Sequence, residues 1–105
     1  MAKSSMEAGV IVNVRIPSPL RSYTGGASEV GIAVPLLAPE HPATLYGVLA
    51  ALDARYRGLR FRIVDEQGRL RPHVKVFVGE TPARDLSTTV PAGRDVMIVA
   101  ALSGG

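Results

Sequence analysis

The residues of this sequence best suited to chemistry are Leu102, Ser103, Gly104 and Gly105, which follow the apolar run of residues 96–101. Glycine has no Cβ, so a Gly-Gly tail can extend close beside another backbone and enter a narrow channel. Such a tail can present the carboxylate of Gly105 to an enzyme that activates it. A frayed chain end has a similar composition, so the tail indicates this chemistry only if the rest of the chain builds a suitable scaffold.

Other chemical groups are scarce. The sequence has no cysteine, which excludes disulfides, thiolate metal sites and a cysteine nucleophile. Sulfur chemistry would therefore need a sulfur atom held somewhere other than a Cys side chain. His41 and His73 are the only histidines, and neither has a second His or Cys at ligand spacing, so no metal site is expected.

Composition describes one globular domain: 105 residues, 47% hydrophobic, 20% charged, with a net charge of +3. The dense basic segment, residues 69–75, has no interleaved aromatic platform, which favours solvated or protein-docking charge over a nucleic-acid site. No apolar stretch approaches the roughly 20 residues that cross a bilayer, so no membrane partner is expected. The polar start lacks the plan of a signal peptide, and we expect a cytoplasmic location.

Alternation of apolar and polar residues predicts strands at residues 10–16 and 29–34, joined by a turn that contains Gly25 and Gly26. After a connector at 35–42, Thr44 is suited to cap a helix, and Gly58 to close it. The apolar positions of this helix, spaced three and four apart, are Leu45, Val48, Leu49, Leu52 and Tyr56.

The second half of the chain is predicted to be mostly β. Residues 59–70 look irregular, with a turn at 65–68, and strands are expected at 73–78, briefly at 84–86, and at 95–101. This order predicts an α+β roll with a mixed sheet of four to five strands and one main helix packed on one face. The expected organisation is a flexible leader (1–9), one domain (10–101) and a flexible tail (102–105).

The last strand is apolar on both faces, and only one face can pack on the helix. The other would place Met97 and Val99 beside Phe77 as an exposed apolar patch, which on such a protein usually marks a partner site. Lys75, on the same outer face, would be a docking charge for an acidic partner. The alternative is that the irregular segment 59–70 covers this patch.

Residues 10–105 resemble the ThiS/MoaD family of ubiquitin-like, β-grasp sulfur carrier proteins. The segments that carry the resemblance are 12–17 (VNVRIP), 20–26 (LRSYTGG), 44–45 (TL), 52–59 (LDARYRGL), 74–80 (VKVFVGE), 92–96 (AGRDV) and 98–105 (IVAALSGG). Together, in this order and with this tail, they are more specific than any one of them.

The resemblance implies a carrier cycle. An adenylating enzyme of the ubiquitin-activating type would use ATP to join AMP to the carboxylate of Gly105. A sulfur donor enzyme would then replace AMP and leave a glycyl thiocarboxylate. The chain would be a cosubstrate rather than an enzyme, with no cofactor bound to it.

The resemblance leaves the receiving pathway open. The long connector and the L-R-x-x-T-G-G turn are most similar to carriers of cysteine biosynthesis, whose sulfur goes to a pyridoxal-phosphate cysteine synthase. The small subunit of molybdopterin synthase, which works with a large subunit, is a close second. That subunit usually has prolines before its Gly-Gly, where this chain has Ala100 and Ala101.

Two other classes of protein remain as alternatives. A ubiquitin-like modifier would use the same fold and tail to form isopeptide bonds with target proteins. A plain interaction module would carry the Gly-Gly tail without using it. The fold alone does not separate these classes from a carrier.

Overall fold

The chain opens with the predicted hairpin. In the computed structural model, which describes residues 9–36, 38 and 40–101, strand β1 (Gly9–Arg15) pairs antiparallel with strand β2 (Glu29–Pro35). Val12 and Val14 of β1 lie opposite Ile32 and Val30 of β2, and all four side chains are buried. The alternation therefore places one face of the hairpin in the core, as predicted, and the first strand begins at Gly9.

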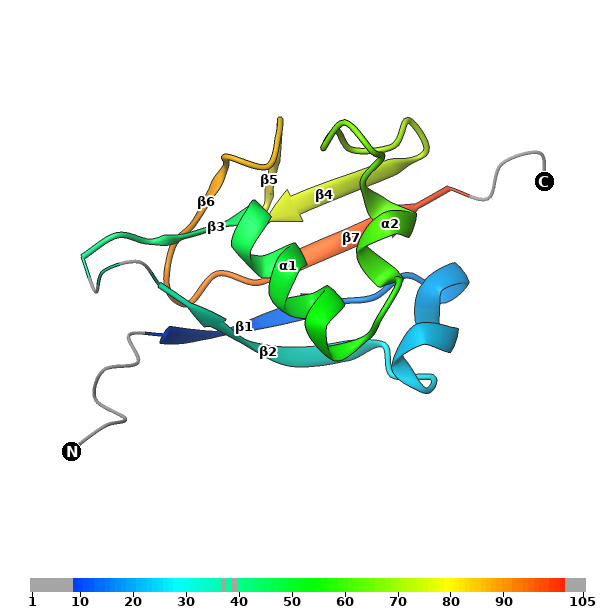
Figure 1. Cartoon of the computed structure of the whole chain (residues 1–105), viewed down its shortest axis with the longest axis horizontal. Helices are drawn as coiled ribbons and strands as arrows, with labels where there is room; N and C mark the ends of the chain where they lie inside the picture. The colour runs from blue at the N-terminus through cyan, green and yellow to red at the C-terminus, as the bar shows by residue number, and fades with distance from the viewer. Residues whose placement is uncertain (1–8, 37, 39, 102–105) are drawn as a thin grey trace.

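The last strand, β7 (Val96–Ala100), lies in the middle of the sheet. It runs parallel to β1 on one side and antiparallel to β4 (Val74–Val78) on the other, and β5 (Thr81–Pro82) forms the edge beside β4. The five strands have the order β2-β1-β7-β4-β5 (Figure 1). This mixed sheet with its helix packed on one face is an α+β β-grasp roll, which confirms the predicted fold class.

Helix α1 (Leu45–Arg55) covers one face of the sheet (Figure 1). The Thr44 hydroxyl accepts a hydrogen bond from the Gly47 backbone N–H at 3.3 Å, which is the predicted N-cap. The buried positions of the helix are Leu45, Val48, Leu49 and Leu52. The helix ends at Arg55 with Tyr56 as its C-cap, so the prediction that Tyr56 lies in the helix and that Gly58 closes it is wrong. Gly58, with φ of +93°, a conformation that favours glycine, instead precedes the next helical segment.

The segment after Gly58 is more regular than its sequence predicts. Residues 59–70 begin with a short helix, α2 (Leu59–Ile63), which buries Leu59 and Ile63 against the core. The Asp53 carboxylate accepts hydrogen bonds from the backbone N–H groups of Gly58 and Arg60, at 3.0 and 3.1 Å. This carboxylate accepts hydrogen bonds from backbone N–H groups that the first turn of a short helix leaves without partners. The beginning of α2 is therefore stabilised by a side chain of α1, which the sequence of residues 59–63 alone does not indicate.

The segment between the first two strands also differs from the prediction. Instead of a simple turn over residues 21–26, the chain forms a 3₁₀ helix, η2 (Ser18–Thr24), which ends at Gly25 with φ of +67°. Leu20 points into the core, and the buried Thr24 hydroxyl hydrogen-bonds to the Ala27 carbonyl at 2.8 Å. Burial of these two side chains gives the connection a fixed shape.

The predicted edge strand at residues 84–86 is wrong. The edge is formed by β5, and a second small sheet joins β3 (Ala43–Thr44) to β6 (Thr89–Val90). Leu86 is buried, and its carbonyl accepts a hydrogen bond from the Tyr46 N–H at 2.9 Å. Residue 86 therefore ties the loop to the start of α1 instead of extending the sheet.

Candidate functional site

The four residues predicted to form the docking face do lie together on one side of the sheet. Phe77 of β4 lies directly opposite Met97 of β7, and Lys75 lies opposite Val99. The pair between them, Val76 and Ile98, is buried under the helices. Because successive side chains alternate across a sheet, the first two pairs occupy the face that carries no helix. We call Lys75, Phe77, Met97 and Val99 the outer patch.

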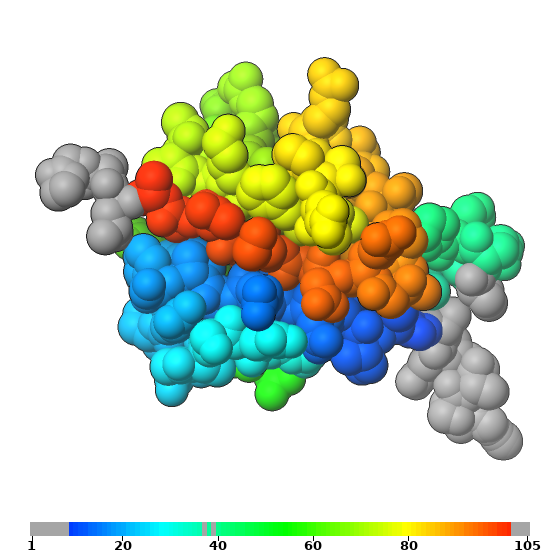
Figure 2. Space-filling model, turned by 180° about the vertical axis from the view of Figure 1, so that it is seen from behind, coloured from blue at the N-terminus to red at the C-terminus, as the bar shows by residue number. Residues whose placement is uncertain are grey.

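The outer patch is open in this structure. Figure 2 shows β7 running across this face between β4 and β1. Val99 is 41% exposed, Lys75 is exposed, and Phe77 and Met97 are half-buried. Helix α2 packs against α1 and η2, on the opposite face, so the interpretation in which segment 59–70 covers the patch is wrong.

Charged residues border the outer patch on the β1 side. Arg15 pairs in register with Met97 across the parallel strands, and its guanidinium lies 3.9 Å from the Glu29 carboxylate. Both side chains are largely exposed, at 61% and 45%, so this ion pair contributes little to stability.

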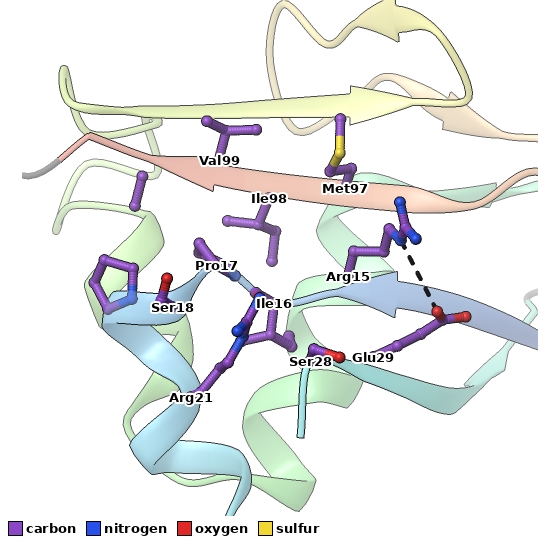
Figure 3. A pocket seen from close by; sticks show the side chains of 12 residues that line it. Arg15, Ile16, Pro17, Ser18, Arg21, Ser28, Glu29, Met97, Ile98 and Val99 are labelled. Carbon is purple, nitrogen blue, oxygen red and sulfur yellow. Dashed lines mark hydrogen bonds and ion pairs between the residues drawn. The ribbon is translucent and has the colours of Figure 1, made fainter. Parts of the chain in front are cut away.

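A hollow of about 500 Å³ lies between the end of β7 and the start of η2. Figure 3 shows its wall: Met97 and Val99 on one side, Pro17, Ser18 and Arg21 on the other. The Arg21 Nε donates a hydrogen bond to the Ile16 carbonyl at 2.9 Å, which fixes this arginine across the connection. The wall formed by residues 17–21 was not predicted from the sequence.

A second hollow, of about 430 Å³, also borders Ala100. Its other lining residues include Leu20 of η2, Phe61 and Arg62 of α2, and Arg71 and His73 from the segment before β4. The sequence predicted a docking or solvated role for the basic segment 69–75, but it did not predict that this segment lies beside α2. Four separate segments therefore converge where the chain leaves the sheet.

The departure point of the tail is fixed by the backbone. The N–H of Ala101 donates to the His73 carbonyl at 2.9 Å, so pairing with the β4 side continues one residue beyond β7. The predicted tail residues Leu102, Ser103, Gly104 and Gly105 lie outside the described residues. The tail therefore starts from the central strand of the sheet, between the two hollows.

Two carboxylates among the described residues have pKa values below the ordinary value of 3.8. The pKa of Asp65 is lowered, chiefly because its carboxylate accepts the Arg69 backbone N–H, and that of Asp85 is lowered by hydrogen bonds from Ser87. Asp65 is half-buried and Asp85 is exposed, and each carboxylate stabilises a turn. Over the same residues, no cluster of three His, Asp or Glu side chains could hold a metal ion.

Helices in residues 9–36, 38 and 40–101 are all too short or too polar to cross a membrane. The outer patch on β4 and β7 is the main apolar candidate surface among the described residues.

Solved structures share this architecture. Mycobacterium tuberculosis CysO is 30% identical, with a TM-score of 0.73 over 87% of this chain and 99% of that one. A chain of the Amycolatopsis orientalis BexX/CysO complex is 28% identical, with a TM-score of 0.73 over 90% and 99%. SAMP1 from Haloferax volcanii, at 22% identity and a TM-score of 0.69 over 90% and 99%, shares the fold. No protein-family model and no curated protein matches the sequence.

The fold and the site define the class of protein as a ubiquitin-like β-grasp domain, similar along nearly its whole length to the CysO structures. Within that class, the chain belongs to the ThiS/MoaD family of sulfur carriers, and is CysO-like.

Proposed function

We propose that this protein carries sulfur as a thiocarboxylate on Gly105. The observation that carries the proposal is its 30% identity to Mycobacterium tuberculosis CysO along nearly the whole of that chain. The position of β7 supports it, because a tail that leaves the central strand beside an open apolar face can reach into a partner enzyme while the domain docks.

The chemistry needs activation because a carboxylate does not react with nucleophiles while its oxygen is a poor leaving group. In the proposed first step, a carboxylate oxygen of Gly105 attacks the α-phosphorus of ATP and pyrophosphate leaves. The terminal sulfur of a donor-enzyme persulfide then attacks the carbonyl and displaces AMP, forming an acyl disulfide. A second thiol cleaves the S–S bond, which leaves the thiocarboxylate on the carrier and a disulfide between the donor and that thiol.

The carrier itself contributes positioning in this proposal. Its cysteine-free sequence supplies no sulfur nucleophile, so in this proposal the sulfur comes from a donor enzyme. The ATP site belongs to a ubiquitin-activating-type adenylyltransferase. The outer patch binds that enzyme: Phe77, Met97 and Val99 offer apolar area, and Lys75 an exposed charge. Burial of such an apolar patch favours association, because it removes apolar surface from water.

Cysteine synthesis is the favoured pathway, with a pyridoxal-phosphate cysteine synthase as the sulfur acceptor. The support is that the two CysO structures are the more identical of the relatives above, at 30% and 28%. Molybdopterin synthesis, with the large subunit of that synthase as acceptor, is second. The cycle consumes ATP, so we place it in the cytoplasm.

A ubiquitin-like modifier is the second candidate function. The observation that favours it is the shared fold with small archaeal modifier protein 1, at 20% identity and a TM-score of 0.69. In this case the adenylated glycine would be attacked by a lysine amine of a target protein, with loss of AMP, and not by sulfur. An interaction module that makes no use of the tail would undergo neither reaction.

The deciding experiment is an intact-mass measurement after incubation with ATP, a persulfide donor and a candidate adenylyltransferase. A mass gain equal to the exchange of one oxygen for one sulfur, lost when Gly105 is deleted and kept in Ser103→Ala, is the expected result. Conjugates to other proteins without this gain would favour the modifier. No change with several active adenylyltransferases would reject both.

A further inference from the structure

The hollow beside Ala101 gathers positive charge. Arg62 comes from α2, while Arg71 and His73 come from the segment that leads into β4, and none of the residues that line the hollow is acidic. Arg62 and His73 are exposed. We call Arg62, Arg71 and His73 the basic hollow.

Arg71 is held in place before any partner arrives. Its Nε donates to the Phe61 carbonyl at 2.8 Å, and its guanidinium carbon lies 4.6 Å from the centre of the Phe61 ring. These two contacts use one donor and one face of the guanidinium, while its two terminal nitrogens are left available for a planar anion. A guanidinium already fixed in this way loses little conformational entropy on binding.

The basic hollow has no acidic counterpart in the part of the chain that the structure describes. The one ion pair among residues 9–36, 38 and 40–101 joins Arg15 to Glu29, on the other face of the sheet. Asp65, the acidic residue nearest in sequence to this cluster, accepts hydrogen bonds from the backbone of Gln67 and Arg69, and the charges of Arg69 and Arg71 help to lower its pKa. Asp65 makes no ion pair with Arg71 in the described domain, so the guanidinium groups of the hollow have no direct carboxylate partner there.

We infer that the basic hollow binds an acidic segment of the adenylyltransferase that receives the tail. The identity of this partner rests on the proposed function; the preference for carboxylates rests on the hollow itself. Arginine forks match carboxylates with paired hydrogen bonds. Because Ala101 lines the hollow, a carboxylate bound there holds the base of the tail while the residues beyond enter the partner.

A protein segment fits the hollow better than a nucleic acid does. Single-stranded nucleic acid is bound by aromatic rings with free faces along a basic groove. Phe61 is the aromatic residue of this hollow, and Arg71 stacks on its ring. A compact cluster with one covered ring suits one or two carboxylates, and not a run of stacked bases.

The test is an NMR titration of the full chain with an acetylated hexaglutamate peptide, with a hexaglutamine peptide as the uncharged control. Backbone amide shifts should concentrate at Arg62, His73 and Ala101, occur only with hexaglutamate, and shrink as salt is added. Shifts spread over the whole domain, or equal shifts with hexaglutamine, would overturn the inference. Tighter binding of an oligouridylate at the same residues would replace it with a nucleic-acid site.

Charge-changing variants sharpen the test. Arg62→Glu reverses a charge and His73→Glu adds a negative one. Both side chains are exposed, so each variant should weaken hexaglutamate binding at least tenfold with an unchanged melting temperature. Arg84→Glu makes the same charge change as Arg62→Glu in the loop between β5 and β6, which does not line the hollow, and should change binding less than twofold. Arg71→Lys keeps the charge but removes the fork and should give an intermediate loss. Equal binding by all four variants would contradict the assignment.

A second readout separates this inference from the proposed function. In ATP–pyrophosphate exchange with the adenylyltransferase, Arg62→Glu should raise the KM for the carrier about tenfold and leave kcat unchanged. If the parent chain supports no exchange but still binds hexaglutamate at the hollow, the proposed function fails and the anion site remains. If exchange proceeds with the same KM in Arg62→Glu and Arg84→Glu, the inference fails and the carrier function remains.

Discussion

Phe77 and Met97 face each other across β4 and β7 on the helix-free side of the sheet, one residue from the pair that fills the core. The strands that hold the core together thus present the candidate docking face as well. A change of side chain at Phe77 or Met97 should alter binding with little effect on folding. A change at the adjacent buried pair, Val76 and Ile98, should instead destabilise the fold.

Replacing Phe77 or Met97 with alanine should weaken binding to the adenylyltransferase about tenfold, because each variant removes apolar contact from the centre of the outer patch. Isothermal titration calorimetry would measure this loss. Ile11→Ala is the matched control: Ile11 is 66% exposed on the same face of the sheet but near the start of β1, away from β7. Equal affinity for the parent and the Phe77 and Met97 variants would reject the outer patch as the docking face.

Val76→Asp should unfold the domain. Val76 is 1% exposed between Phe77 and Lys75, and an aspartate there would bury a charge with no partner. Leu52→Asp, at a fully buried position of α1, should do the same. Circular dichroism melts would show the loss of a cooperative transition. A melting temperature equal to that of the parent, for either variant, would contradict the packing described for this core.

Thr44→Ala should lower the free energy of unfolding by about 1 kcal/mol, since the first turn of α1 loses its N-cap acceptor. Thr44→Ser retains a hydroxyl and should recover most of that loss. Urea denaturation of the three proteins would measure the difference. If Thr44→Ser were as unstable as Thr44→Ala, the methyl group and not the cap would be the stabilising part.

Asp65→Asn should destabilise the domain at neutral pH but not in strong acid. The Arg69 N–H, then the Gln67 N–H and nearby arginines, lower the pKa of Asp65 below its ordinary value of 3.8. A carboxyl whose pKa is lower in the folded state stabilises that state above its unfolded pKa, and this contribution disappears as the pH falls through the folded value.

Urea midpoints of Asp65→Asn and the parent should therefore differ at pH 7 and converge well below pH 3.8. Glu66→Gln, which removes the same charge from the adjacent exposed residue, should leave the midpoint unchanged at both values. A gap between Asp65→Asn and the parent that persists in acid would show that the charge of Asp65 is not what stabilises the turn.

Sequence periodicity predicted the elements that bury a regular face. Strands β1, β2, β4 and β7 and helix α1 repeat β-branched or leucine side chains at spacings that only one secondary structure satisfies. Helix α2 escaped prediction because five residues give too little periodicity, and because its start depends on Asp53 from a different element. The two-residue strands β3 and β6 exist only through their pairing with each other.

The candidate site was predictable where it follows alternation along a strand. The outer patch came from the alternation at Lys75, Phe77, Met97 and Val99, and the structure groups these four as expected. The two hollows were not predictable, because each is lined by segments that are distant in sequence and meet only when the sheet closes. The basic segment 69–75 is evident in the sequence, but nothing in the sequence shows that Phe61 and Arg62 of α2 lie beside it.

The place of β7 between a parallel and an antiparallel neighbour has a mechanical consequence. An enzyme that draws in the residues beyond Ala101 pulls along the axis of a strand bonded on both sides, to β1 and to β4. Such a load shears many hydrogen bonds at once, whereas a strand at the sheet edge would peel away from a single neighbour. In the proposed carrier cycle, this placement would favour a domain that stays folded while a partner enzyme holds the residues beyond Ala101.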